Sequence, residues 1–379
     1  VQGFRQGRST AALRISPVRW DAATGALERV TRLRVRLELG AAEGEPVRRL
    51  RDASQDLGTQ RRAVSASAQS ASPDPRGFQP TLLPSVLGSP VEYVIITDGT
   101  PASEFRRLAD WKTNKGIPAA VRTTALIKQE YPNGADDADR IRQFIRDAYT
   151  RWGTKYVLLA GDVHLVPTRF ARTVFYGGEN IPCDMYFSCL DGNWNADGDS
   201  VFGEGYATPS DPGDNADLLP EVYVGRATVS SLGDVQLFVD KTLQYEKTPV
   251  GDYENSVLFF AEVLFPQDWE EGQLITMDGA QLAEECLPSL QAHPGIRYVR
   301  MYENYTDPLY EPGAYPISKQ AVIDSLDRGY NIAVHIGHGY RNVMAVGHGE
   351  NLDNSNALGL SNGNRLFNLY ATNCTSAAI

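Results

Sequence analysis

Two short apolar stretches decide the fold predicted for this chain: Tyr330-Asn-Ile-Ala-Val-His-Ile-Gly-His338-Gly339 and Leu366-Phe-Asn-Leu-Tyr-Ala-Thr-Asn-Cys374. Each is typical of a buried strand that ends at a residue capable of nucleophilic or proton-transfer chemistry. Neighbouring strands of a parallel sheet deliver their carboxyl ends to one edge, where open α/β folds place their active sites. The two stretches therefore predict that an imidazole and a thiol meet there as a Cys–His dyad, which indicates a cysteine peptidase.

The residues from Val91 onward alternate between short apolar runs and amphipathic stretches. We expect strands at 93–97, 156–160, 221–226, 256–261 and 296–301, and helices at 103–115, 136–152, 232–247, 274–290 and 318–328. This alternation predicts an α/β fold with a mostly parallel sheet and helices on both faces. A break near 249–252 divides the pattern into two similar halves, 91–250 and 251–379.

The chain before Val91 has a different character. Period-two alternation over 12–20 and 30–39, around a short turn, predicts a small β-rich module within residues 1–50. Residues 51–90 are rich in Ser, Ala, Pro, Gln and Arg without periodicity, which is typical of an exposed, cleavable linker. The dibasic pair Arg61-Arg62 lies inside that linker.

The formal charge of −11 at pH 7 is unevenly distributed along the chain. Residues 1–65 carry 13 Arg, no Lys and 7 Asp or Glu, a net charge of +6, which leaves −17 for the remainder. Opposite net charges favour docking of the two parts on each other. The basic part is small and lacks an aromatic-basic motif, so we expect no nucleic-acid partner. We also expect no membrane span, because no apolar run approaches the required ~18–20 residues.

The sequence contains four cysteines: Cys183, Cys189, Cys286 and Cys374. Cys183 and Cys189 are close enough in sequence to form a disulfide that closes a small loop in an oxidising environment. The sequence does not decide whether they do. Cys286 lies in a helical pattern and is expected to be buried and inert. No set of cysteines has the spacing of a zinc site.

Residues 193–204, Asn-Trp-Asn-Ala-Asp-Gly-Asp-Ser-Val-Phe-Gly-Glu, fit the twelve-position template of a calcium-binding loop, except that Asn replaces the usual Asp at position 1. No EF-hand helices are evident around the loop. Several carboxylates and other hard oxygen donors suit a structural Ca²⁺ ion. The alternative is a solvated acidic loop held by Asx turns. The candidate ligands are Asp191, Asn193, Asn195, Asp197, Asp199 and Glu204.

The motifs of the second half, taken in order, resemble those of the gingipain family of cysteine peptidases. They are Phe260-Ala-Glu262, His335-Ile-Gly-His338-Gly339, Asn362-Gly-Asn-Arg-Leu and Thr372-Asn-Cys374, supported by Leu159-Ala-Gly-Asp162, Tyr223-Val-Gly-Arg226 and Asp240-Lys-Thr-Leu-Gln-Tyr-Glu246. Phe4-Arg-Gln-Gly followed by Ile15-Ser-Pro-Val is similar to the end of that family's propeptide. The resemblance therefore covers nearly the whole chain.

The resemblance implies a caspase-like fold and a secreted endopeptidase, extracellular or at the cell surface, in a zymogen-like form. Residues 1–50 would be a propeptide fragment that inhibits the enzyme, and the other partners would be protein or peptide substrates. Glu262 would be a third catalytic member that orients the imidazole. The family's catalytic domain continues beyond the nucleophile, so we expect an incomplete substrate pocket in a chain that ends five residues after Cys374.

The residue types lead to the same mechanism. A thiolate at Cys374 needs a proton acceptor or a nearby cation to form near neutral pH, and His338 supplies one. The same imidazole would protonate the leaving amine and later activate water, while the backbone N–H groups of Gly339 and Cys374 hold the oxyanion. His348 also precedes a glycine and is a rival base, but a longer apolar strand leads to His338. His335, inside that strand, is expected to be structural.

Specificity and reaction type stay open at this level. Specificity for a basic residue before the cut is a hypothesis. The best-known gingipains have an acidic residue that binds the Arg or Lys side chain of the substrate. Its position falls near Gln273 in this sequence, and the nearby acids Glu270, Glu271 and Asp278 do not align with it cleanly. Cleavage at Arg61 or Arg62 during maturation is consistent with the hypothesis. One alternative function is a sortase-like transpeptidase of the same family, in which an amine captures the acyl-enzyme. The other is a catalytically inactive calcium-binding domain.

Overall fold

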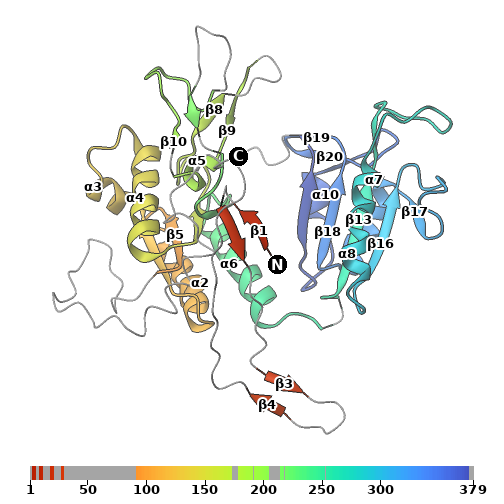
Figure 1. The fold of residues 1–379 in the computed structure, drawn as a ribbon, viewed down its shortest axis with the longest axis horizontal. Helices are drawn as coiled ribbons and strands as arrows, with labels where there is room; N and C mark the ends of the chain where they lie inside the picture. Colours follow the sequence, from red (N-terminus) through yellow and green to blue (C-terminus); the bar gives the residue numbers. More distant parts are fainter. Residues whose placement is uncertain are drawn as a thin grey trace. The chain divides into compact units, whose positions relative to one another are not determined.

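The computed structural model describes residues 91–172, 178–190, 192–204, 214–216, 218–251 and 253–374, together with the backbone of four short strands before residue 30 (Figure 1). The chain divides into two compact units, Val1–Pro75 and Arg76–Ile379. The predicted linker at 51–90 lies outside the described residues.

Among its described residues, the first unit contains two antiparallel pairs of strands. The pairs are β1 (Gln2–Arg5) with β2 (Arg8–Ala11), and β3 (Val18–Trp20) with β4 (Leu27–Arg29). Strands β3 and β4 lie on either side of the predicted turn and pair with each other. The predicted strand at 30–39 lies outside the described residues.

The second unit begins with a parallel sheet in the order β12-β7-β5-β6. Its strands are β5 (Tyr93–Thr97), β6 (Ala119–Thr123), β7 (Tyr156–Ala160) and β12 (Tyr223–Ala227). Its helices are α2 (Ala102–Asn114), α3 (Thr124–Glu130), α4 (Asp137–Trp152), α5 (Met185–Ser188) and α6 (Leu232–Lys247). Two short antiparallel pairs extend from it, β8 (Phe170–Arg172) with β9 (Asn180–Pro182) and β10 (Gly192–Asn193) with β11 (Asn215–Ala216).

Helix α4 shows why these sequences form these elements. The Asp136 side chain accepts a hydrogen bond from the Asp139 N–H and so caps the first turn. Gly153, with φ of 69°, ends the helix in the left-handed conformation that glycine adopts readily. Ile141 and Phe144 are among the residues that form its buried face. The helix is therefore specified locally and held by packing.

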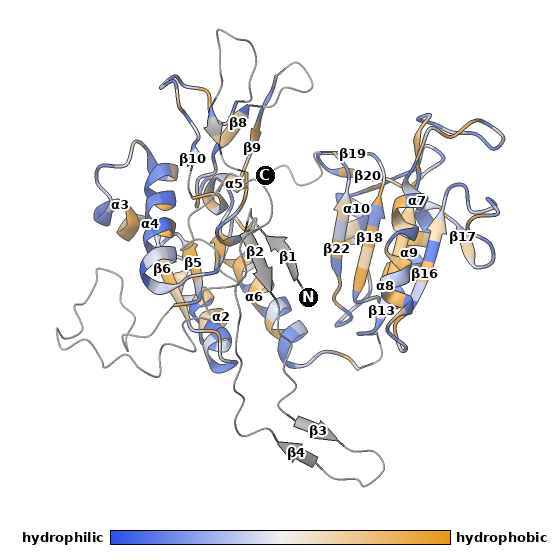
Figure 2. Ribbon diagram, viewed as in Figure 1, coloured by the Kyte–Doolittle hydropathy of each residue, from blue (hydrophilic) through white to orange (hydrophobic). Residues whose placement is uncertain are grey.

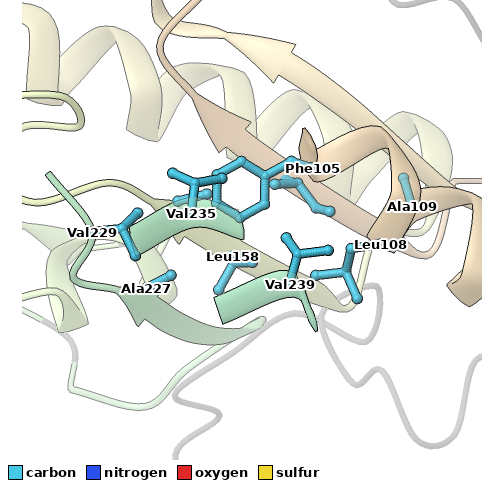
Figure 3. Packing of buried hydrophobic residues seen from close by; sticks show 10 residues of the cluster. Phe105, Leu108, Ala109, Leu158, Ala227, Val229, Val235 and Val239 are labelled. Carbon is cyan, nitrogen blue, oxygen red and sulfur yellow. The ribbon is translucent and has the colours of Figure 1, made fainter. Parts of the chain in front are cut away.

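A hydrophobic core lies between the first sheet and the helices α2 and α6. Figure 3 shows Phe105 and Leu108 from α2 facing Val235 and Val239 from α6, with Leu158 of β7 beneath them. Side chains alternate between the two faces of a strand, so the buried neighbours of these strand residues point to the opposite face. Helix α4 covers that opposite face (Figure 1), and helices on both faces are what the alternation predicts.

The second sheet is also parallel, in the order β17-β16-β13-β18-β22. Its strands are β13 (Ser256–Ala261), β16 (Arg297–Tyr302), β17 (Ala314–Pro316), β18 (Ile332–Ile336) and β22 (Asn368–Thr372). Its helices are α7 (Gly279–Glu284), α8 (Leu287–Gln291), α9 (Lys319–Arg328) and α10 (Asn354–Leu358). The short strands β14 (Val263–Phe265), β15 (Met277–Asp278), β19 (Gly339–Tyr340), β20 (Val343–Ala345) and β21 (Asn351–Asp353) form hairpins near it.

The second sheet has a core on each face. Phe259 packs with residues of α7 and α8, whereas Phe260 packs with Val322 and Leu326 of α9. Figure 2 shows hydrophobic colour concentrated on the central strands, including β18. In each sheet the strand that comes first in the sequence, β5 or β13, lies between two later strands. The order of the strands therefore runs in opposite directions on its two sides, which gives each half a topological switch point. Ligand sites of open α/β folds lie at such a point, beyond the carboxyl ends of the strands.

Three local predictions are wrong. The predicted helix 274–290 is divided into β15, α7 and α8, because Met277 pairs with β14 and Pro288 starts a new helix. Strand β22 is exposed along its whole length instead of buried, because it lies at the edge of the described sheet. Cys286 is exposed for a related reason, since the break places it at the start of α8 and outside any long helix.

Cys183 and Cys189 both remain thiols in the structure. Among the helices of the described residues, none is long and apolar enough to cross a membrane.

A buried ion pair anchors β12 to the segment that follows β7. The Arg226 guanidinium, 5% exposed, donates from Nε and Nη2 to the two oxygens of Asp184 at 2.6 and 2.8 Å. Its Nη1 also donates to the carbonyls of Gly161 and Val166 at 2.9 and 2.6 Å. Its Nη2 also donates to the Pro167 carbonyl at 3.4 Å, so one side chain satisfies five acceptors.

Arg226→Ala removes the guanidinium from three carbonyls and from the Asp184 carboxylate, which keeps only the Thr168 hydroxyl as donor among the described residues, so we expect the free energy of unfolding to fall by about 3 kcal/mol. Urea denaturation at pH 7.5 measures it. Arg107, half exposed and paired with Asp240 on the surface, offers the control, and Arg107→Ala should cause no comparable loss. Equal stability of the two variants would contradict this account of Arg226.

Candidate active site

The parallel ladder of the second sheet carries three of the predicted catalytic residues to one edge. Ile336 of β18 pairs with Thr372 of β22, and the Gly337 N–H donates to the Thr372 carbonyl at 3.2 Å. His338 and Cys374 each follow two residues after that last pair, on adjacent strands. Glu262 directly follows β13, the strand on the other side of β18.

The His338 ring is oriented by a backbone carbonyl. Its Nε2 lies 2.8 Å from the carbonyl oxygen of Leu264, and the Phe265 ring packs edge-on against it with centroids 5.6 Å apart. A carbonyl only accepts, so Nε2 carries the proton in this contact. Nδ1 is then the ring atom that can accept a proton from a nucleophile.

The Glu262 carboxylate, 5% exposed, binds the backbone that carries His338. Its Oε1 accepts a short hydrogen bond from the His338 N–H, and its Oε2 accepts one from the Gly347 N–H at 3.1 Å. Burial raises the pKa of this carboxyl, and the two backbone N–H groups oppose that rise. Glu262 therefore holds the turn around His338, and the Leu264 carbonyl bonds the ring itself.

His335 is fully buried and bonded on both ring nitrogens. Its Nε2 lies 2.7 Å from the Ala345 carbonyl oxygen, and its Nδ1 lies 3.1 Å from Nδ2 of Asn373. Burial lowers the pKa of this imidazole below its usual value, because the cation loses its hydration, and the positive charge of His338 when protonated adds to the effect. The structural role expected for His335 thus includes a contact to the residue before Cys374.

The turn between His335 and His338 leaves no space for a side chain at position 337. A Cβ on Gly337 would lie 2.7 Å from Nε2 of His335 and 3.1 Å from Cδ of Glu262. Gly339, the predicted oxyanion donor, begins β19 and pairs with Met344 of β20. Glycine at 337 therefore lets the buried carboxylate and the buried imidazole approach the same turn.

A cavity of about 190 Å³ adjoins His338. Its lining includes the carboxylates of Glu262, Asp268, Glu303 and Glu350. Groups of one sign in a concave site concentrate the field and attract ligands of opposite charge. Glu303 was not among the predicted site residues, although it directly follows β16 just as Glu262 follows β13.

Other candidate groups lie in different environments. Glu303 accepts the His348 N–H at 2.7 Å and the Val263 N–H at 2.9 Å, and lies 3.6 Å from Nδ1 of His348. This rival base is thus held by a carboxylate in the cavity, and its φ is +51°. Asp278, considered earlier as a specificity acid, caps α7 and accepts from Asn304 and Tyr310 at 2.7 and 2.6 Å.

The predicted calcium loop is held by backbone contacts and brings three carboxylates together. Single oxygens of Asp197, Asp199 and Glu204 all lie within 4.8 Å of one another. Oδ1 of Asn195 is buried without a hydrogen-bond partner among the described residues. An uncompensated buried oxygen suits a cation ligand, so these donors fit Ca²⁺.

Residues on both sides of the calcium loop also bear on this site. Asp191 lies outside the described residues, whereas Asn193 accepts the Asn195 N–H at 3.0 Å in an Asx turn. Asp214, which the sequence analysis missed, accepts N–H groups of Gly203 and Glu204 at 2.7 and 3.4 Å. Pairing of β10 with β11 brings Asp214 to the loop, and the sequence gives no local signal for that pairing.

Comparison with known proteins places the chain in a family. The profile described as peptidase family C25 matches residues 87–379. The chain belongs to peptidase family C25. Gingipain R2 of Porphyromonas gingivalis (strain ATCC BAA-308 / W83) is 21% identical over 290 residues, which are 75% of this chain and 32% of that protein. Gingipain R1 of Porphyromonas gingivalis is 21% identical over the same share of this chain and 24% of its own length. The chain thus spans about a third or less of these relatives.

Solved structures of this family share the fold. The complex of Porphyromonas gingivalis RgpB pro- and mature domains matches with a TM-score of 0.52 and 20% identity, over 75% of this chain and 55% of that one. The Arg specific cysteine proteinase gingipain R (RGPB) matches with a TM-score of 0.53 and 20% identity, over 76% and 56%. These matches confirm the predicted α/β, caspase-like fold.

The low pKa of His335 makes stability depend on pH with a definite sign. The unfolded chain binds a proton at this imidazole near pH 6.5, whereas the folded chain does so only at lower pH. Acidification through that window therefore favours unfolding, by at most about 1.4 kcal/mol per pH unit. Glu262, whose pKa is raised, contributes with the opposite sign.

We expect His335→Gln to lose less stability than the wild type between pH 7.5 and pH 5.5, because Gln does not titrate. Urea denaturation at both pH values measures the difference, and Glu262 cancels in the comparison. Identical losses in the two proteins would show that His335 is not protonated on unfolding.

Proposed function

We propose that this chain is the catalytic part of a cysteine endopeptidase, with Cys374 as nucleophile and His338 as general base and acid. The observation that carries the proposal is the in-register pairing of β18 with β22, together with the Nε2 contact of His338 to Leu264. The ladder brings the two residues to one edge, and the carbonyl directs Nδ1 to be the proton acceptor. Membership of family C25 supports the same chemistry.

The mechanism follows from these groups. The Cys374 thiol gives its proton to His338 Nδ1, and the thiolate attacks the scissile carbonyl carbon. Backbone N–H groups of Gly339 and Cys374 would stabilise the oxyanion, where one donor is typically worth ~10²–10³ in rate. The imidazolium then protonates the leaving amine, and a thioester remains on Cys374. Water, deprotonated by His338, attacks the thioester and releases the acid and the thiol.

The acidic cavity supports a preference for Arg or Lys before the cut. Glu303 and Asp268 line it beside His338, and a basic side chain would meet complementary charge there. A solved relative is described as Arg specific. Cleavage after Arg61 or Arg62 would fit this preference.

We also propose a secreted, zymogen-like form, with residues 1–50 as an inhibitory propeptide. A solved structure of RgpB contains pro- and mature domains in complex, which supports this arrangement by analogy. The net charge of +6 on residues 1–65 is opposite to that of the remainder. Opposite charges favour such an association.

Capture of the thioester by an amine would make the protein a sortase-like transpeptidase. Such an enzyme would use the same dyad, so only the acceptor differs. Product analysis with an added glycine amide separates the two reactions. A dominant amide product in dilute amine would favour the transpeptidase over the hydrolase.

A peptidyl probe with a thiol-reactive warhead tests the dyad and the specificity together. We expect the wild type to be labelled at Cys374, labelling to vanish in Cys374→Ala, and its rate to fall by about 10²-fold or more in His338→Ala. Probes with Arg or Lys at P1 should react faster than probes with Leu or Asp. Intact mass spectrometry measures each rate.

Cys286→Ala is the matched control, because that thiol is exposed but lies away from the ladder. It should be labelled like the wild type. Labelling that survives in Cys374→Ala would sink the assignment of the nucleophile, and an inert wild type after removal of residues 1–90 would favour a catalytically inactive calcium-binding domain.

We further propose a structural Ca²⁺ ion in the loop 193–204, held by Asp197, Asp199, Glu204 and the buried Oδ1 of Asn195. The ion would neutralise three carboxylates that otherwise repel each other. It supplies no chemistry to the dyad in this proposal.

Ca²⁺ should raise the unfolding midpoint of the wild type, by a stabilisation of about 2.7 kcal/mol when the free ion is at 100 times its dissociation constant. Asp199→Asn with Glu204→Gln should abolish the increase, while Asp110→Asn on α2 should preserve it. Thermal unfolding with added Ca²⁺ or EGTA measures the effect. A wild type indifferent to Ca²⁺ would show a solvated acidic loop instead.

A further inference from the structure

A chain of hydrogen bonds connects the backbone of His338 to the residue before Cys374. The Ala345 N–H donates to the His338 carbonyl at 2.9 Å. The Ala345 carbonyl in turn lies 2.7 Å from Nε2 of His335, and Nδ1 of His335 lies 3.1 Å from Nδ2 of Asn373. Three contacts therefore run from the His338 backbone to Asn373, the residue before Cys374, without passing through either functional group of the proposed dyad.

The partners on both sides define the tautomer of His335. The Ala345 carbonyl can only accept, so Nε2 carries the ring proton. Nδ1 is then an acceptor and receives the hydrogen bond from the Asn373 amide. The opposite tautomer would place a lone pair against the carbonyl and a proton against the amide. The observed contacts are thus directional, and one protonation state satisfies both.

The surroundings of His335 argue that more than packing is involved. The ring is fully buried and lies beside Phe260, with centroids 5.0 Å apart. A purely hydrocarbon ring could also pack against Phe260, but it would bond neither neighbour. A polar group is stable at such a position only when it is satisfied, and here its two partners belong to the segments that carry His338 and Cys374.

We propose that His335 is a positioning residue, which fixes the backbone before Cys374 relative to the turn of His338 through Asn373 and Ala345. Its catalytic consequence rests on the proposed function of the dyad. The contact matters because the described ladder joins β22 to β18 through the backbone, and the bond from Asn373 to His335 adds a side-chain restraint directly before Cys374. A displacement near 1 Å of a reacting group can cost about 10²-fold in rate.

The test is a double-mutant cycle on the full chain, activated by removal of residues 1–90. His335→Phe keeps the ring and removes both hydrogen bonds, and Asn373→Ala removes the donor. We expect each to lower kcat by about 10–10²-fold with little change in KM. The double variant should be no slower than the worse single variant, because both changes remove the same contact.

Asn354→Ala is the control, since this asparagine is exposed on α10, and it should keep the wild-type kcat. Urea denaturation of each variant separates positioning from loss of folding. The proposal is overturned if the single variants keep the wild-type kcat, or if their losses add in the double variant and follow the loss of stability.

Nitrogen-15 NMR of the histidine rings tests the contact without relying on activity. The wild type should show His335 protonated at Nε2 alone, with Nδ1 shifted in Asn373→Ala, and the Cys374 amide resonance should move in His335→Phe. A wild type that neither cleaves nor reacts with the probe would refute the proposed function, and these spectra would still decide the positioning. An Nδ1-protonated ring, or a Cys374 amide indifferent to His335→Phe, would refute the positioning.

Discussion

The hydrogen-bonded ladder that joins β13, β18 and β22 is the constraint on which the candidate site depends. Each strand is followed within two residues by a chemically active group: Glu262, His338 and Cys374. A slip of one residue in this register would turn every side chain of a strand to the opposite face. The same pairing that buries Phe259 and Phe260 on the two faces of the sheet therefore also sets the distances at its edge. Stability and site geometry share one backbone pattern.

Much of the fold could be predicted from the sequence, because helices and central strands carry their own periodicity. The failures occurred where a distant partner decides the outcome. Met277 is drawn into a hairpin by β14, which breaks the predicted helix 274–290. Strand β22 has the composition of a buried strand, yet its burial depends on strand order, and the sheet places it at an edge. Neither outcome can be predicted from the residues of the segment alone, because both depend on distant strands.

The site was predictable to the extent that it consists of side chains at strand ends. The sequence and the family resemblance together indicate His338, Cys374 and Glu262, with Glu262 expected to orient the imidazole. In the structure the ring bonds the carbonyl of Leu264, and Glu262 bonds the backbone N–H groups of His338 and Gly347. Asp214 was not predicted to lie at the calcium loop, because only the pairing of β10 with β11 across a long loop brings it there. Backbone partners and non-local pairs leave no signature in residue type.

The use of a peptide carbonyl to orient His338 has an evolutionary consequence. Every amino acid supplies the same carbonyl, so residue 264 can vary without removing the acceptor to which the ring donates its hydrogen bond. Selection at this position can act only on the path of the main chain. The imidazole is thus protected from a class of point mutations that would disable a side-chain partner, whereas an insertion or deletion between Glu262 and Leu264 would move the acceptor away from it.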